Sequence, residues 1–425
     1  MDQPSARSSR LAEPQFCTGC SACRAVCPHD AIQMASDAEG FLRPEINHGR
    51  CVGCGLCERA CPVLRPGSER LPKMVLAMRA KDEALRRCSS SGGVFSLLAY
   101  KTLSRGGVVF GAAFDPTEVK VRHMAVRTER ELSLLRGSKY VQSDIGDAYC
   151  CVLSELRAEK EVLFSGTPCQ VAGLKSFLST VAPNTDCGRL LLVEVICHGA
   201  PSPMIFSKYL ESIKKHHLAR SGLSGGDAIT DLSFRDKICG WNHFSMTICS
   251  RSGAIYSKKH GGDLFYRCFF KHLISRPSCS SCPFRQLRSG SDVVLGDYWR
   301  VGERFPQFDD NQGVSLVLEA TGKGGRAVSQ ILQECDSADS DYEHAVRVNS
   351  LLVFSKKSNS RRSLFFWLAG KFPFDFAARI VLLPTVKEFS EKALACLVSL
   401  VPTWLRDSAL ARAVKSFLGQ DRGPR

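Results

Sequence analysis

The sequence has no long apolar run and no common nucleotide-phosphate motif. Its C-terminal apolar stretches, at 363–370 and 393–405, fall short of the roughly 18–20 residues that span a bilayer. Residues 1–10 contain no apolar stretch, so we expect no secretory signal. The dinucleotide fingerprint and the phosphate-loop lysine motif are both missing. These absences argue against a transmembrane or a secreted protein, and we expect a cytoplasmic one.

Acidic residues are scarce toward the C-terminus. Residues 356–425 hold thirteen Lys or Arg against five Asp or Glu, within a formal net charge of +15 for the chain. No aromatic-rich basic motif accompanies this charge, so we expect no nucleic-acid partner. Apolar residues recur at helical spacing from Leu394 to Leu405. This basic helix either lies on the inner face of a membrane through 356–425, or packs against its own domain or a partner subunit.

Cysteine, in contrast, is abundant, with 21 residues. Without a secretory signal, reduced thiols fit better than disulfides. Eight of the cysteines form the pattern Cys-x2-Cys-x2-Cys-x3-Cys-Pro twice, at 17–28 and at 51–62. Zinc sites rarely place three cysteines at this spacing with a fourth before proline. The doubled pattern indicates two [4Fe-4S] clusters.

The two-cluster bacterial ferredoxin pattern predicts which cysteines share a cluster. Each cluster takes three cysteines from one run and the last cysteine from the other. We therefore assign one cluster to Cys17, Cys20, Cys23 and Cys61, and the second to Cys51, Cys54, Cys57 and Cys27. Residues 1–70 are thus expected to form a ferredoxin-like domain that handles single electrons.

Beyond a proline-rich linker at 63–72, short apolar runs alternate with helical patterns. The patterns predict strands at 108–110, 162–164, 190–196 and 293–295, and helices at 94–103, 170–178 and 203–215. This alternation is typical of a mixed α/β domain. The predicted fold class is therefore α+β, with a ferredoxin-like domain, a mixed α/β domain and a basic helical tail.

Further cysteines lie close to the predicted strands. Cys169 and Cys197 follow two of them, and Cys279 and Cys282 form a Cys-x2-Cys-Pro motif before the strand at 293–295. Ligands of open α/β sheets gather beyond the carboxyl ends of strands, so these four residues are candidates for a third [4Fe-4S] cluster. Two alternatives stay open: ordinary buried cysteines, or a low-pKa redox thiol at Cys169. The remaining cysteines are expected to be structural: Cys88, Cys150, Cys151, Cys187, Cys239, Cys249, Cys268, Cys335 and Cys396.

A loop of small residues directly precedes the predicted helix at 94–103. It consists of Ser89, Ser90, Ser91, Gly92 and Gly93. A flexible loop before a helix offers free amides and the positive end of the helix dipole to a phosphate. Serine and glycine at this position are also typical of a simple helix cap. Residues 136–142, which include Lys139 and Tyr140, would add cationic donors and an aromatic face.

Together these motifs resemble the beta-subunit family of the deazaflavin (coenzyme F420) hydrogenases and dehydrogenases. The resemblance covers about residues 14–300 and includes, besides the doubled cysteine motif, Ser-Ser-Ser-Gly-Gly at 89–93, Gly-Ser-Lys-Tyr-Val-Gln-Ser at 137–143, Gly-Thr-Pro-Cys-Gln at 166–170, Cys-His-Gly at 197–199, Cys-Ser-Ser-Cys at 279–282 and Gly-Asp-Tyr-Trp at 296–299. It implies an iron–sulfur flavoprotein in which FAD lies against the α/β domain and clusters relay electrons to or from it.

The resemblance also implies a division of the chain and of its residues. A flavin-binding part would span 71–155, a part with the third cluster 156–350, and the tail 351–425. Residues 89–93, Lys139, Tyr140 and Thr167 would bind FAD, and Cys169, Cys197, Cys279 and Cys282 the third cluster. His198 and Lys139 are the candidate catalytic residues, as proton donors near the flavin, with Asp297 as a further candidate. His198 fits a structural role beside Cys197 equally well.

The predicted function is that of an iron–sulfur flavoprotein oxidoreductase. A protein such as ferredoxin would exchange single electrons with the clusters, and FAD would exchange two electrons with an organic or deazaflavin-type acceptor. The alternative is an electron-transfer subunit without a substrate of its own. Such a subunit would dock onto a partner enzyme. One form of this alternative places that partner at the membrane surface, in polysaccharide biosynthesis.

Overall fold

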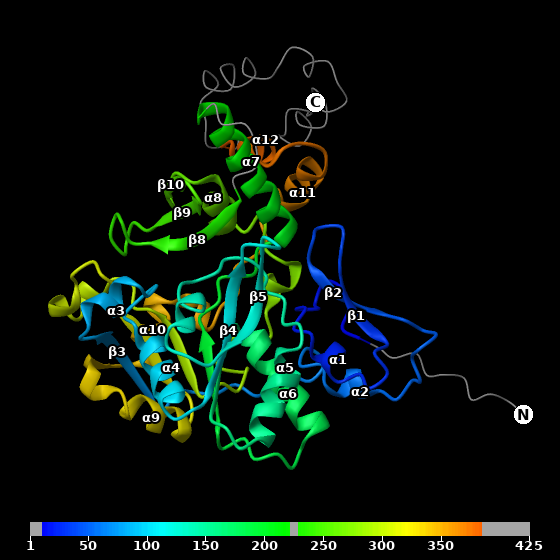
Figure 1. Cartoon of the computed structure of the whole chain (residues 1–425), viewed down its shortest axis with the longest axis vertical. Coiled ribbons are helices and arrows are strands. Elements are labelled where there is room, and N and C mark those ends of the chain that lie inside the picture. Colours follow the sequence, from blue (N-terminus) through cyan, green and yellow to red (C-terminus); the bar gives the residue numbers. More distant parts are fainter. Residues whose placement is uncertain (1–10, 222–227, 385–425) are drawn as a thin grey trace, which may run out of the picture.

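The computed structural model describes residues 11–221 and 228–384, which fold into three parts (Figure 1). A small N-terminal module, blue in Figure 1, lies beside helices α5 and α6. A large mixed sheet with helices on both faces forms the centre, and a smaller sheet with its own helices forms a separate lobe above it in this view. The combination confirms the predicted α+β class.

The N-terminal module repeats one local geometry, as its sequence motif does. α1 (Ala22–Ala25) and α2 (Leu56–Arg59) each start after a residue in the left-handed region, Ser21 at φ 64° and Gly55 at φ 70°. β1 (Ile32–Ser36) and β2 (Leu42–Ile46) pair antiparallel, with Ile32 opposite Ile46. The linker after Pro62 has no regular structure up to β3, as predicted.

The large sheet is parallel in the middle and antiparallel at both edges. Its order is β13-β3-β12-β11-β7-β6-β4-β5, and the neighbours among β11, β7, β6 and β4 run parallel. The strands are β3 (Met74–Ala80), β4 (Val108–Asp115), β5 (Lys120–Val126), β6 (Val162–Gly166), β7 (Leu190–Val195), β11 (Val293–Asp297), β12 (Ser315–Glu319) and β13 (Cys335–Ser340). Strands from both 71–155 and 156–350 therefore belong to one sheet.

Helices cover both faces of this sheet because its central strands are apolar on both sides. Phe164 and Leu192 pack against α5 (Ala148–Arg157) and α6 (Pro168–Val181). Leu163 and Val193 pack on the opposite face, in the same core as α4 (Val94–Ser104) and α9 (Gly322–Ser329). α3 (Glu83–Arg87) and α10 (Tyr342–Val348) lie toward the β3 side of the sheet.

The smaller lobe is a three-stranded antiparallel sheet packed on helices. Its strands β8 (Ile229–Asp236), β9 (Ser245–Ser250) and β10 (Gly253–Lys259) pair in the order β10-β9-β8. Its helices are α7 (Pro203–Ser221), α8 (Leu264–Phe270), α11 (Arg362–Lys371) and α12 (Phe374–Leu382). Tyr209 and Tyr256 both donate hydrogen bonds to the buried carboxylate of Asp263, at 2.6 and 2.7 Å. These bonds join α7 and β10 to the start of α8.

All seven helices and strands predicted from periodicity are present, most of them slightly longer than predicted. In the tail, α11 and α12 contribute Phe365, Phe374 and Val381 to the core of the smaller lobe. The predicted amphipathic helix at 394–405 lies outside the described residues. In the part of the chain that the structure describes, every helix is too short or too polar to cross a bilayer.

Glu194 on β7 makes the stability of the fold depend on pH. It is 5% exposed and accepts hydrogen bonds from Ser289 and Ser291, and burial raises its pKa from 4.5 to about 7. The folded state binds this proton more tightly than the unfolded state. The free energy of unfolding therefore falls by about 3 kcal/mol in total as the pH rises between these two values, and it changes no further above them.

We therefore expect Glu194→Gln to flatten this part of the pH profile. Urea unfolding of the anaerobic protein at about pH 5 and about pH 8 should show a smaller difference in the variant than in the wild type. The control is Glu45→Gln, since Glu45 is exposed. The same pH dependence in wild type and Glu194→Gln would contradict the assignment.

Candidate functional site

Three neighbouring parallel strands deliver the site residues to one edge of the large sheet. β6 ends at Gly166 and leads to Cys169, β7 ends at Val195 and leads to Cys197, and β11 ends at Asp297. These turns border a cavity of about 430 Å³. The site thus lies beyond the carboxyl ends of the strands, as expected for an open α/β sheet.

The serine-glycine loop forms one wall of this cavity. Ser89, Ser90, Ser91 and Gly93 line it, and Gly93, at φ 91°, is the N-cap of α4. Ser90 Oγ accepts a 2.7 Å hydrogen bond from the Ser138 amide, which joins the loop to the segment before Lys139. The loop can therefore present amides and the positive end of α4 to an anion.

Gly92 has a different role from the rest of the loop, because it does not line the cavity. Its amide donates to Ser315 Oγ at 3.0 Å, and a Cβ at this position would lie 2.3 Å from Met78 O. Glycine is required here because the loop packs tightly against β3 and β12. Gly92 therefore holds the loop against β3 and β12.

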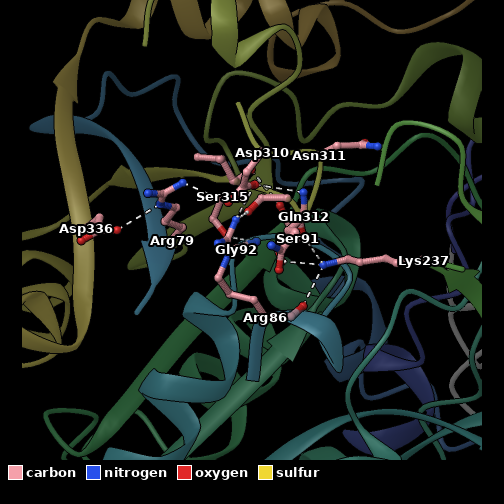
Figure 2. A network of polar contacts seen from close by, with 12 residues as sticks. Arg79, Arg86, Ser91, Gly92, Lys237, Asp310, Asn311, Gln312, Ser315 and Asp336 are labelled. Carbon is pink, nitrogen blue, oxygen red and sulfur yellow. Dashed lines mark hydrogen bonds and ion pairs between the residues drawn. The ribbon is translucent and has the colours of Figure 1, made fainter. Parts of the chain in front are cut away.

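A polar network holds the outer side of this loop (Figure 2). Lys237 extends from the end of β8, and its Nζ donates to three carbonyl oxygens, those of Arg86 (2.8 Å), Ser91 (3.1 Å) and Gln312 (2.6 Å). Asp310 pairs with Arg86 at 2.8 Å and also accepts from the Gln312 amide at 3.0 Å. Lys237 thus joins the smaller lobe to the loop. Burial lowers its pKa to about 7.

Lys139 and Tyr140 lie on the cavity wall, as their motif predicted. Lys139 Nζ donates to Leu134 O at 3.0 Å and Arg136 O at 2.7 Å, and burial lowers its pKa to about 7. The Tyr140 ring packs against Phe269, with ring centroids 5.3 Å apart. Near neutral pH, a change in the surroundings of Lys139 can therefore protonate or deprotonate its amine.

The opposite end of the cavity is aromatic and cationic. Arg235 on β8 is 5% exposed, and its guanidinium lies over the rings of Phe244 (4.5 Å) and Trp299 (5.3 Å). Its Nη1 is paired with Asp297, while Nε and Nη2 have no hydrogen-bond partner among the residues that the structure describes. Arg136, Lys139 and Arg235 line the cavity against a single carboxylate, Asp297. The cavity therefore favours an anionic occupant.

Two of the predicted proton donors have surroundings that limit this role. His198 lines the cavity, and burial lowers its pKa to about 4, so its imidazole is neutral at pH 7. Asp297 is held by Arg235 and by Trp241 Nε1, which donates to Oδ1 at 3.0 Å. Asp297 therefore orients the cationic end of the cavity, while proton donation by His198 or Lys139 stays a prediction.

The N-terminal cysteines gather in the two predicted sets. After burial, the neighbours Cys17 and Cys61 raise the pKa of Cys23, and Cys23 and Cys61 raise that of Cys20. The second set, Cys27, Cys51, Cys54 and Cys57, borders one small cavity of about 20 Å³. Cys54 is exposed, whereas Cys20 and Cys23 are buried. The first set is therefore the more buried of the two, although Cys57 of the second set is buried as well.

The internal cysteines also come together, from three separate segments. Burial and then Cys279 raise the pKa of Cys197, and Cys169 and Cys279 act in the same direction on Cys282. The Ala200 amide donates to Cys279 Sγ at 3.4 Å, and the Gly199 amide to Cys197 Sγ at 3.4 Å. Amides that point at sulfur stabilise metal-bound thiolates. The donor set therefore fits a cluster ligated by four thiolates.

Neither internal nor N-terminal cysteines are spaced for a single ion. Among residues 11–221 and 228–384, no three His, Cys, Asp or Glu side chains converge closely enough to share one metal. A cubane needs a wider spacing, because each cysteine binds a different iron.

Two family models match the chain. Residues 16–64 match the 4Fe-4S dicluster domain, and residues 159–339 match the domain described as the C terminus of the coenzyme F420 hydrogenase/dehydrogenase beta subunit. The two matches bear out the predicted resemblance to the coenzyme F420 hydrogenase/dehydrogenase beta-subunit family. They also confirm an N-terminal domain for two 4Fe-4S clusters, as the sequence predicted.

Two curated proteins and one solved structure are similar to this chain. One subunit of the Na(+)-translocating ferredoxin:NAD(+) oxidoreductase complex of Acetobacterium woodii is 41% identical over 46 residues, 11% of this chain and 13% of that protein. One subunit of the F(420)H(2) dehydrogenase of Methanosarcina mazei is 22% identical over 200 residues, 44% of this chain and 55% of that protein. The chain thus matches only part of either relative. A chain of the F420-reducing [NiFe] hydrogenase complex from Methanosarcina barkeri aligns over 67% of this chain and 89% of its own length, at 15% identity and a TM-score of 0.43.

Several residues of the site lie outside any motif. Arg235, Trp299 and Lys237 come from the smaller lobe and from the end of β11, and His123 on β5 lines the cavity from the edge strand. Trp299 is the exception, since it belongs to the Gly-Asp-Tyr-Trp motif. Arg235, Lys237 and His123 are single polar residues in strands or directly after them, and no sequence spacing marks them as site residues.

The ligand assignment predicts how double substitutions combine. Because Cys20 and Cys61 are assigned to the same cluster, Cys20→Ser/Cys61→Ser should lose no more iron than Cys20→Ser alone. Cys20→Ser/Cys57→Ser, which affects both clusters, should lose about twice as much. Iron analysis and the EPR spectrum of the reduced, anaerobically reconstituted protein measure both quantities. The exposed Cys150→Ser is the control, and equal losses in the two double variants would refute the assignment.

Proposed function

We propose that this chain is an iron–sulfur flavoprotein that passes electrons between a protein partner and an acceptor bound in the cavity. The observation that carries the proposal is a continuous series of cysteine sets. Cys57 of the outer set lies within electrostatic reach of Cys23, and Cys169 of the internal set within reach of Cys20. Cys169 and Cys197 in turn line the cavity. The series supports a path from the surface to the cavity.

FAD is the proposed occupant of the cavity. Bound there, a flavin would convert single-electron transfer into two-electron chemistry. The serine-glycine loop and the start of α4 would hold its phosphates, Arg136 and Lys139 would balance their charge, and Lys237 would keep the loop in position. The smaller lobe, with Phe244 and Arg235, would cover the opposite end together with Trp299 and exclude water. This arrangement supports an organic, anionic acceptor at the Arg235 end.

The relatives suggest where electrons enter or leave. The two curated relatives are named as subunits of larger complexes, one of which acts on ferredoxin. The exposed Cys54 and the 58% exposed Val52 support a contact between a protein such as ferredoxin and the second N-terminal cysteine set, Cys27, Cys51, Cys54 and Cys57. The alternative function, an electron-transfer subunit without its own acceptor, shares this contact and differs only in lacking FAD.

Removal of the Cys-x2-Cys pair tests the third cluster. We expect iron and acid-labile sulfide of the reconstituted protein to fall by about one third in Cys279→Ser/Cys282→Ser, since one of three clusters is lost. Cys150→Ser/Cys151→Ser, a pair of exposed cysteines, serves as the control and should retain all iron. Unchanged iron in the first variant would return these residues to a structural role.

Flavin content separates the enzyme from the electron-transfer subunit. We expect the reconstituted wild type to retain FAD and to oxidise reduced ferredoxin when a small acceptor is present. Lys237→Met should bind FAD at least about tenfold more weakly without losing iron, because the loop loses a donor to three carbonyls. Lys81→Met is the matched control, since Lys81 Nζ binds one carbonyl at the surface. Cluster redox activity without any FAD binding would favour the alternative.

A further inference from the structure

Arg276 lies where the N-terminal module meets the internal cysteine set. Its carbonyl accepts a 3.1 Å hydrogen bond from the amide of Cys279, three residues later. Its guanidinium reaches into the N-terminal module, where Nη1 donates to Cys17 O at 3.4 Å and Nη2 to Leu42 O at 3.2 Å. One residue therefore connects a proposed ligand of the internal cluster, through its backbone, with a ligand of the nearer N-terminal cluster, through its side chain.

The charge of Arg276 is buried without a carboxylate beside it. The residue is 2% exposed, and among the described residues its guanidinium hydrogen bonds go only to carbonyl oxygens, with none from Nε. A buried cation without a counter-charge is strongly unfavourable. Burial lowers the pKa of Arg276, and the neighbours that oppose this shift are cysteines, first Cys279 and then Cys17 and Cys169. Its counter-charge must therefore come from the two cysteine sites.

Gly19 shows that the fold makes room for this guanidinium. Gly19 lies between Cys17 and Cys20, and a Cβ there would stand 2.2 Å from Arg276 Nη1 and 2.5 Å from Leu42 O. Its φ of 62° also disfavours other residues. Gly19 thus has two roles: it shapes the loop between two cluster ligands, and it leaves space for the Arg276 guanidinium next to the cluster.

We propose that Arg276 is the counter-cation shared by the Cys17/Cys20/Cys23/Cys61 cluster and the internal cysteine site, and that it raises the reduction potential of both. The proposal deepens the proposed function, on which its second half rests. Reduction adds one negative charge to a cluster, and a nearby buried cation favours that state. Arg276 is thus a positioning residue. It ligates no iron, and its charge sets how readily each of the two sites is reduced.

The test is the reduction potential of the Cys17 cluster in the full, anaerobically reconstituted chain. Its EPR signal is the one lost in Cys20→Ser. Arg276→Gln should shift the one-electron reduction equilibrium toward the oxidised form by about tenfold, a potential lower by about 59 mV. Arg276→Lys, which keeps the charge, should retain most of the wild-type potential. An unchanged potential in Arg276→Gln would overturn the proposal.

Arg362→Gln is the matched control for a loss of packing. Arg362 is also buried and donates to Ser275 O at 2.9 Å, next to Arg276, but its charge is neutralised by Glu39. We expect this variant to lose stability and keep the potential of the Cys17 cluster. If Arg276→Gln does not assemble its clusters, Arg276→Lys decides: assembly at the native potential supports the proposal, and loss of assembly in both variants overturns it.

The same measurements separate this proposal from the proposed function. If Cys279→Ser/Cys282→Ser keeps all its iron, the relay through an internal cluster fails. The effect of Arg276 on the Cys17 cluster is still read from its own EPR signal. A relay that is confirmed together with an unchanged potential in Arg276→Gln would refute the role of Arg276 alone.

Discussion

The parallel pairing of β6, β7 and β11 is the constraint on which the site depends. Val193 lies opposite Ser165 on one side and Val293 on the other, so the three strands end at one edge of the sheet. A shift of one residue in β7 would exchange its two buried faces, which pack against different helices. The positions of Cys169, Cys197 and Asp297 therefore follow from the packing of the core.

Docking of the N-terminal module gives its two cysteine sets different environments. α1 packs on α6, where Gly173 approaches Cys20 so closely that a Cβ would stand 3.2 Å from its sulfur. The repeated motif is symmetric in sequence, but contact with α6 buries Cys20 while Cys54 stays exposed. This asymmetry gives the module one side for a partner and one side for the interior of the chain. The ion pair between Glu39 and Arg362 ties the same module to the tail helix α11.

Local patterns predicted the helices, the strands and the 4Fe-4S domain, and long-range contacts supplied the rest. The strand–turn–cysteine pattern is also a local signal, and the structure brings its cysteines to one edge of the large sheet, while their role as cluster ligands stays a prediction. Arg235, Lys237 and Arg276 carry no such signal, because each acts through partners far away in sequence: Asp297, Arg86 and Cys17. The smaller lobe was missed as a unit for the same reason. Its strands are partly polar and are separated by loops without a repeated spacing.

The charges around the cavity connect binding to protonation. Burial lowers the pKa of Lys139 to about 7, so near neutral pH its amine carries only part of a charge. A diphosphate held by the loop at Ser90 would favour the protonated amine and raise that pKa again. Binding an anion would then draw a proton into the cavity, which His198 also lines with its neutral imidazole. Lys139, which would neutralise the phosphates, would thereby also hold a proton in the cavity. A two-electron reduction in the cavity would consume such a proton.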